Sequence, residues 1–302
     1  MSWAKEIKRK IASIKNTWKI TKAMELISTV KMKKAQDLAL EKRDFVIEML
    51  KIFLRIEDYL SDYPLFKNWK WDKTLWVIIT SNKWLCWGYN VNVMKKVNSY
   101  MKETWENLDF VTIWKKWAQF VVRTWNNLVA DFSKDFADNV SPFFTKDISR
   151  FLRDEFLSWK YSKVVIFYSF FVNTIKQIPV VKVSLPISYE EIKKYLLEIV
   201  DWHFDMEAEL KKNENIFWYD VEPSPEAVVN EVIPIILDMM FYDVILDAKA
   251  SEHSARMIAM KNAKESSNNI ADNLTLQYNK ARQAIITKEV SEIVSWVETL
   301  KD

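Results

Sequence analysis

The sequence predicts an α/β protein with two parts: a long antiparallel coiled coil made by the two ends of the chain, and a central domain of strands and helices. All seven prolines lie between positions 64 and 234, so residues 1–63 and 235–302 contain none. Between these ends, short apolar runs alternate with helical periodicity, which is typical of strands that alternate with helices. We therefore expect an N-terminal helix over 1–63, an α/β domain over 70–205, and a C-terminal helix over 222–302 that pairs with the first.

Both proline-free ends carry a narrow apolar stripe. In the N-terminal end, the stripe comprises Ile7, Ile11, Ile14, Trp18, Ile20, Met24 and Ile27. In the C-terminal end, steps of three and four connect Met260, Ala263, Ser267, Ile270, Leu274, Tyr278, Ala281 and Ile285. This spacing indicates the seam of a coiled coil rather than the broad face of a core helix. A helix of about 60 residues is about 90 Å long, so part of each end must project, and the other end is the obvious partner.

The central domain is predicted from short apolar runs bounded by turn residues. We expect strands at 74–80, 110–113, 163–169 and 180–185, with helices at 91–103 and 147–157. The run at 180–185 has prolines on both sides, which favours an edge strand. The alternation predicts a small parallel or mixed sheet covered by helices, in a Rossmann-like arrangement. The last helix should begin at 222–226, where two prolines precede an acidic residue.

Composition excludes several classes of protein. Cys86 is the only cysteine and His203 and His253 the only histidines, so an intramolecular disulfide, a multi-thiolate zinc site and a transition-metal cage are not expected. The net charge of +3 does not indicate a nucleic-acid binder. No run of 18 apolar residues is present and the first ten residues lack an apolar signal core, so we expect neither a membrane span nor a secretory signal.

Two segments contain residues that could bind a ligand or take part in catalysis. The loop 80–90 follows a strand and precedes a helix, so it could cradle a phosphate; without a recognised glycine spacing, a structural tight turn is favoured. Within it, Cys86 is expected to be a small buried hydrophobe. His253 has polar sequence neighbours, but adjacent residues on a helix diverge, so we expect a solvated or interhelical histidine. No catalytic set can be assembled, and no cofactor is expected.

Tryptophan and glycine occur at unusual frequencies. The chain has 15 tryptophans and one glycine, Gly88, whereas about 7% glycine is usual. Many tryptophans stand at polar turn sites where a positive φ is often needed, as at Trp84, Trp87, Trp114 and Trp159. We hypothesise that most are glycine codons, UGA, read as tryptophan; the alternative is a truly tryptophan-rich protein. The hypothesis predicts tryptophan rings that are exposed, in turns or at positive φ.

The N-terminal helix is strongly basic. Over residues 1–45, basic residues outnumber acidic ones by more than two to one. Contact with an acidic protein surface, contact with nucleic acid, and a merely solvated face all remain open at this point.

Several separate motifs resemble one family. Residues 5–25 (KEIKRKIASIKNTWKITKAME) resemble the opening of the gamma subunit of F-type ATP synthases. Its ending is similar to residues 222–225 (EPSP), 248–257 (AKASEHSARM) and 276–287 (LQYNKARQAIIT). The loop 80–90 (TSNKWLCWGYN) resembles the family's T-S-[DN]-[RK]-G-L-C-G-G-[YFL]-N, with Trp84 and Trp87 in place of glycines. The resemblance covers nearly the whole chain.

The resemblance implies a mechanical, non-catalytic role in a proton-translocating ATP synthase. The coiled coil would be the rotor shaft inside a ring of alpha and beta subunits, and the α/β domain would sit on the c-subunit ring beside the epsilon subunit. Rotation would then drive each beta subunit through its binding states. The residues do not distinguish protons from sodium ions, because the ion site lies on other subunits.

The resemblance also implies contact residues and a location. Arg282, Gln283 and Thr287 would touch a beta-subunit loop, Met24 and Arg256 would lie in the same coupling region, and residues 217–220, including Tyr219, would approach the c ring. The basic helix would face acidic segments of beta, so protein is favoured over nucleic acid. The location would be peripheral, at the cytoplasmic face of the bacterial cell membrane, without direct insertion. The alternatives are a nucleotide-binding α/β enzyme with a coiled-coil arm, using residues 80–90, and a basic coiled-coil protein that binds nucleic acid.

Overall fold

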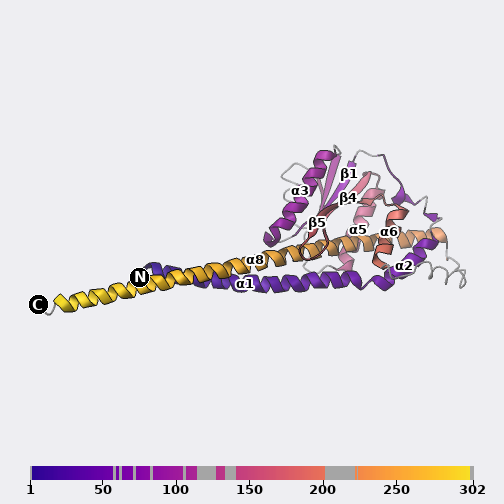
Figure 1. Cartoon of the computed structure of the whole chain (residues 1–302). Helices are drawn as coiled ribbons and strands as arrows, with labels where there is room; N and C mark the ends of the chain where they lie inside the picture. Colours follow the sequence, from indigo (N-terminus) through magenta and orange to yellow (C-terminus); the bar gives the residue numbers. More distant parts are fainter. Residues whose placement is uncertain are drawn as a thin grey trace. The chain divides into compact units, whose positions relative to one another are not determined.

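A computed structural model of the chain divides it into two compact units (Figure 1). The helix-pair unit comprises residues 1–30 and 256–302, and the sheet unit comprises residues 31–255. Two long helices, α1 (Ser2–Leu40) and α8 (Pro225–Thr299), contribute to both. The structure describes residues 2–56, 59–60, 63–70, 73–81, 84–104, 107–113, 127–132, 141–200, 222 and 224–299.

The sheet unit is built on five strands in the order β3-β2-β1-β4-β5. Strands β1 (Lys73–Ile79), β2 (Asn107–Ile113), β3 (Asn127–Asp131) and β4 (Lys163–Phe171) run parallel, and β5 (Gln177–Leu185) lies antiparallel at the edge beside β4. In the chain, α3 (Trp87–Glu103) lies between β1 and β2, and α5 (Pro142–Leu157) lies between β3 and β4, as expected where a parallel neighbour cannot be reached through a tight hairpin. The sheet is therefore mixed, and β5 is an edge strand, as the sequence predicts.

The strands alternate between two apolar layers. Trp76 and Ile78 of β1 face one side, where α3 (Trp87–Glu103) covers them, while Leu75 and Val77 face the other. The second side is covered by α2 (Arg43–Arg55), α5 (Pro142–Leu157), α6 (Tyr189–Val200) and the first part of α8, and most of the core lies there. Figure 1 shows α3 on one side of the strands and α5 and α6 on the other. The described part of the unit also contains two 3-10 turns, η2 (Pro64–Phe66) and η3 (Trp84–Cys86).

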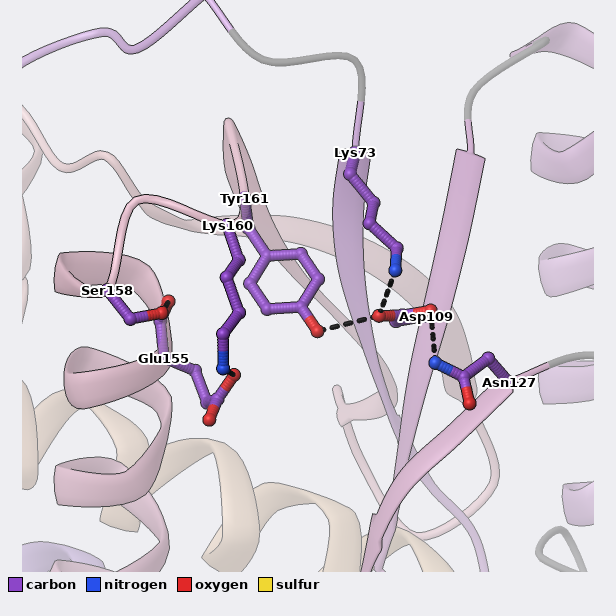
Figure 2. A network of polar contacts seen from close by, with 7 residues as sticks. All are labelled: Lys73, Asp109, Asn127, Glu155, Ser158, Lys160 and Tyr161. Carbon is purple, nitrogen blue, oxygen red and sulfur yellow. Dashed lines mark hydrogen bonds and ion pairs between the residues drawn. The ribbon is translucent and has the colours of Figure 1, made fainter.

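A buried carboxylate joins the starts of the strands (Figure 2). One oxygen of Asp109 in β2 accepts hydrogen bonds from the Tyr161 hydroxyl at 2.7 Å and from the Lys73 ammonium at 2.7 Å. The other oxygen accepts one from the Asn127 amide at 2.8 Å. Burial raises the pKa of Asp109, but these three donors outweigh it and hold that pKa below its ordinary value. The carboxylate thereby ties β1, β2, β3 and Tyr161, two residues before β4, together at the end of the sheet where the parallel strands begin.

The helix-pair unit contains the predicted seam, with a shifted register. On α1 its side chains are Ile7, Ile11, Ile14, Trp18, Thr21, Met24 and Ser28, and on α8 they are Met260, Ala263, Ser267, Ala271, Leu274, Tyr278, Ala281 and Ile285. The predictions for Ile20, Ile27 and Ile270 are wrong, because these side chains are about half exposed or more. Steps of three and four from Trp18 reach Thr21 and Ser28, so helix geometry overrides the apolar character of their neighbours.

The overall fold class is confirmed: long terminal helices accompany a central mixed sheet with helices on both faces. Two details differ from the expectation. The N-terminal helical segment breaks after Leu40, so that α2 is separate. Strand β3 and helix α6 are additional elements. Helix α8 begins at Pro225, within the expected start at 222–226, and continues through Pro234.

The described tryptophans fall into different environments. Trp159 follows the last turn of α5 with φ 63°, the left-handed conformation in which helices usually carry glycine, and it is 52% exposed. Trp3 and Trp296 are also exposed. Trp76 of β1 is the opposite case, because its side chain is fully buried in the apolar layer that α3 covers. Trp84 and Trp87 lie in helical backbone, in η3 and at the first residue of α3, so the expectation of a left-handed turn there is wrong. Trp114 lies outside the described residues.

No helix in the described part of the chain is both long enough and apolar enough to cross a lipid bilayer.

Candidate partner-binding surface

The end of α8 presents exposed apolar side chains in the helix-pair unit. We call residues 282–299 the tip. Of the described side chains after Ala281, none is buried. Figure 1 shows α8 continuing past the N-terminus of α1. An apolar stripe with helical spacing follows one side of the tip, formed by Ile286, Val290, Ile293 and Val294, each about half exposed or more. Exposed apolar side chains gathered on one helix face mark a surface that other molecules cover.

Three of the residues implied as beta-subunit contacts lie on this tip. Arg282, Gln283 and Thr287 are all exposed on α8. The Thr287 hydroxyl donates a hydrogen bond to the backbone carbonyl of Gln283 at 3.0 Å. Arg282 follows Ala281, the last buried residue of the seam. These side chains can offer charged and amide donors to a partner.

The other two described candidates lie deeper. Met24 is half-buried on α1, next to Glu25, and the Glu25 carboxylate forms a salt bridge with Lys264 of α8 at 2.6 Å. Arg256 is buried, with 4% of its surface exposed. Met24 and Arg256 are therefore less accessible than the three tip residues. The Glu25–Lys264 pair is a cross-helix contact that sequence reasoning missed, although the two residues stand beside seam positions in both helices. Tyr219 and the rest of 217–220 lie outside the described residues.

The surface of α1 in this unit is basic. Lys5, Lys8, Arg9, Lys15, Lys19 and Lys22 are all exposed, and Glu6 pairs with Lys10 at 2.8 Å. Hydrogen bonding to Lys10 lowers the pKa of Glu6. The Lys22 ammonium lies 5.0 Å from the centre of the Trp18 ring. A row of outward lysines on a rigid helix suits an acidic partner.

The loop 80–90 closes on itself. The side-chain oxygen of Asn90 accepts hydrogen bonds from the Ser81 amide at 3.0 Å and the Ser81 hydroxyl at 3.1 Å, while the Asn90 amide donates to Ser81 Oγ at 2.9 Å. Cys86 is 1% exposed, as expected for a small buried hydrophobe, and its Sγ donates to Ser81 Oγ at 3.1 Å. The Asn90 side chain thus occupies the Ser81 backbone amide, which agrees with a structural turn.

His253 is buried in the sheet unit, with 4% of its surface exposed, so the solvated interpretation is wrong. It lines a cavity of about 260 Å³ together with Lys34 and Leu38 of α1 and Tyr242 of α8, in agreement with the interhelical interpretation. Among the described residues, no group of three histidine, cysteine, aspartate or glutamate side chains could hold a metal ion.

Comparison with known proteins gives one consistent match. The family model described as ATP synthase matches residues 3–300. The ATP synthase gamma chain of Pelotomaculum thermopropionicum is 34% identical over 299 residues, covering 98% of this chain and 99% of the relative. That of Akkermansia muciniphila is 32% identical over 305 residues, with 98% and 99% coverage. A chain of the Euglena gracilis mitochondrial ATP synthase rotor has a similar fold, with a TM-score of 0.58, 14% identity, and coverage of 94% and 98%.

Proposed function

The chain belongs to the ATP synthase gamma chain family, and on this basis we propose that it is the central rotor subunit of a proton-translocating F-type ATP synthase. Membership makes it a non-catalytic subunit of that complex. In the proposal, rotation of the membrane c ring turns this chain, and the turning chain drives conformational cycling in the catalytic beta subunits. The coupling arises because each rotor orientation makes different contacts with successive beta conformations.

The observation that carries the proposal is the exposed apolar tip. A helix with an apolar stripe along its exposed end is poorly suited to water, and a surrounding ring of alpha and beta subunits would cover it. Arg282, Gln283 and Thr287 would then meet a beta-subunit loop, with Met24 and Arg256 in the adjoining coupling region. The lysines of α1 would face acidic segments of beta.

The remaining partners belong to the sheet unit. We propose that residues 217–220, including Tyr219, approach the c ring and that the epsilon subunit binds beside them. The complex would hold this chain at the cytoplasmic face of a bacterial cell membrane as a peripheral protein. We propose that the predicted segments 1–63 and 222–302 form the shaft and that the predicted segment 70–205 forms the body.

Reconstitution tests the proposal. The full chain is mixed with alpha, beta and epsilon subunits and a c-ring sector of a related synthase, and ATP-driven proton pumping is measured in vesicles. We expect pumping that depends on this chain and is abolished when Arg282 and Gln283 are both replaced by alanine. A matched control replaces Glu48 and Lys51, a surface pair of α2, by glutamine and should pump normally. Assembly with full pumping in the Arg282/Gln283 variant would contradict the assigned contacts.

A further inference from the structure

A cluster of charged residues surrounds one turn of α8 inside the sheet unit. Lys42 lies at the break between α1 and α2, and its ammonium forms a salt bridge with Asp243 of α8. Both side chains are largely buried, with 14% and 20% of their surfaces exposed. The Tyr195 hydroxyl of α6 donates a hydrogen bond to the second oxygen of Asp243 at 2.5 Å. Residues from two different parts of the unit therefore hold one carboxylate.

A second carboxylate and a second lysine extend this arrangement. Asp247 follows Asp243 by four residues, so both carboxylates lie on the same side of α8. It interacts electrostatically with Lys42 and with Lys182 of the edge strand β5. The ammonium groups of Lys42 and Lys182 lie 6.0 Å and 5.9 Å from the centre of the Tyr195 ring. We call Lys42, Lys182, Asp243 and Asp247 the charge cluster. Its two lysines and two aspartates balance in charge.

The apolar contacts of α8 beside this cluster are incomplete. A cavity of about 240 Å³ borders α8 at Met240, Phe241 and Val244, and Lys182 and Tyr195 lie on its other walls. The apolar side chains of α8, Leu237, Val244 and Ile245 among them, are buried in the core and turn one face of the helix toward it, but apolar contact is non-directional and sets the rotation only broadly. Charged groups are more restrictive. Turning α8 by one residue, about 100°, would carry both carboxylates away from both lysines and leave partly buried charges unpaired, which is strongly unfavourable.

We propose that the charge cluster fixes the rotational setting of α8 within the sheet unit and so transmits torque between the sheet and α8. The inference rests on the proposed rotor function for the torque, whereas the fixing of the helix is a property of the sheet unit alone. Lys42, Lys182, Asp243 and Asp247 are in this sense positioning residues. They contact no reacting group, and they act through the helix that they hold.

The charge state of the cluster depends on pH. Burial raises the pKa of Asp247 to about 6, against the opposing effect of the two lysines, and burial lowers the pKa of Lys42 to about 8, against the effect of Asp247. Both groups are therefore charged between about pH 6 and pH 8. The groups besides Lys42 that interact electrostatically with Asp247 are Tyr168, Lys182 and Tyr195, and Asp243 pairs with Lys42. Glu191 and Glu198 act on Lys182. Within that pH interval both groups carry charge, so turning the helix would leave both charges unpaired.

The test removes the charges of Lys42, Asp243 and Asp247, three of the four members of the charge cluster, and keeps side chains of similar volume. The triple variant Lys42→Met, Asp243→Asn, Asp247→Asn is compared with the wild-type chain in the reconstituted complex, measuring ATP hydrolysis and protons pumped per ATP. Spin labels on α8 and β4 report the distribution of distances between helix and sheet. We expect hydrolysis to continue, protons pumped per ATP to fall severalfold, and the distance distribution to broaden. The matched control neutralises the exposed Glu48–Lys51 pair of α2 and should change none of these.

A charge-reversed variant keeps the proposal falsifiable if the triple variant folds poorly. Lys42→Asp with Asp243→Lys retains an ion pair of opposite direction and should recover most of the pumping per ATP and the narrow distance distribution. An unchanged distribution and unchanged pumping in the triple variant would overturn the proposal. Failure of the rotor function is distinguishable, because the wild-type complex would then fail to pump while the distance measurements on the isolated full chain would still report the cluster.

Discussion

The two units of this chain are stabilised by different kinds of side chain. The sheet unit has a wide apolar core, in which Phe53, Trp76 and Phe167 are completely buried. The helix-pair unit has a narrow seam whose buried members include Thr21, Ser28, Ser267, Ala271 and Ala281. Small and polar seam residues bury little apolar surface per turn. The sheet unit is thus built to fold on its own contacts, whereas the helix pair needs a partner to cover its exposed apolar residues.

The largest expected effect follows from removing the end of the helix pair. A chain that stops before Leu274 should lose coupled ATP synthesis while the sheet unit melts at an unchanged temperature, because the deleted residues contribute nothing to the sheet unit's core. Coupled synthesis is measured in reconstituted vesicles, and melting is followed by the near-ultraviolet signal of the buried aromatic residues. A chain that lacks only residues 300–302 is the control. Melting of the sheet unit on truncation would break the division into two units.

Two tryptophan substitutions within the sheet unit should have opposite signs. Trp76 contacts Tyr100, Phe110 and Phe167 at ring-centre distances of 5.4, 5.7 and 4.8 Å, so Trp76→Gly should destabilise by about 3–5 kcal/mol through the cavity it leaves. Trp159→Gly should stabilise by about 1–2 kcal/mol, because glycine adopts a positive φ without strain. Chemical denaturation measures both.

Residues 76 and 159 also sharpen the hypothesis that most tryptophans are UGA glycine codons read as tryptophan. The backbone at residue 159 favours glycine, and the packing at residue 76 favours tryptophan. We therefore expect mass spectrometry of the native protein to find glycine at 159 and the large residue at 76. Intact tryptophan in the peptide that spans residue 159 would contradict the hypothesis at its best-supported position.

The pH dependence of the sheet unit should carry a contribution from Asp247. Its pKa is about 6 in the folded chain, above the ordinary 3.8, so the stability associated with its protonated form is lost as pH rises from about 4 to 6. The difference in unfolding free energy between the wild type and Asp247→Asn should change by no more than about 3 kcal/mol over this interval. Asp109 has a lowered pKa and contributes with the opposite sign in both proteins, so it cancels in the comparison. A difference that does not depend on pH would contradict the assignment.

The smallest effect is expected in the helix pair. Breaking the Glu25–Lys264 salt bridge with Glu25→Gln should cost about 0.5–1 kcal/mol, because 25% and 19% of the surfaces of the two side chains stay exposed to water. A double-mutant cycle with Lys264→Gln isolates the interaction, and the exposed Lys288–Glu292 pair serves as the reference. A coupling energy no larger than that of the reference pair would show that the seam alone joins the helices.

The sequence predicts the elements with strong periodicity and misses those set by tertiary contact. Strand β1 and both long helices follow from their apolar patterns. The break after Leu40 has no proline or glycine to mark it, and it coincides with the burial of Lys42 against α8. Short β3 has only partly buried residues, so its pattern is weak. In the seam, isoleucines next to Thr21 and Ser28 misdirected the prediction, although the spacing from Trp18 identifies the inward positions.

The candidate partner-binding surface also has some features that the sequence predicts and others that depend on the folded structure. Arg282, Gln283 and Thr287 were named through resemblance to a family, and the structure places them on an exposed helix face. The apolar stripe beside them is visible in the sequence as a spacing of four and three from Ile286 to Val290 and Ile293, but its exposure depends on where α1 begins relative to α8. Such exposure is a property of the folded unit, and no local pattern encodes it.

The central claim is that the helix pair is the part of the chain that a ring of alpha and beta subunits encloses. Its most direct test is affinity purification of the tagged full chain from its native membranes, with subunit stoichiometry measured by mass spectrometry of the intact complex. We predict one copy of this chain with several copies each of alpha and beta, protection of the tip from protease within the complex, and loss of that protection when the ring is dissociated. A chain that purifies without alpha and beta subunits, or whose tip is cleaved equally in both states, would contradict the account.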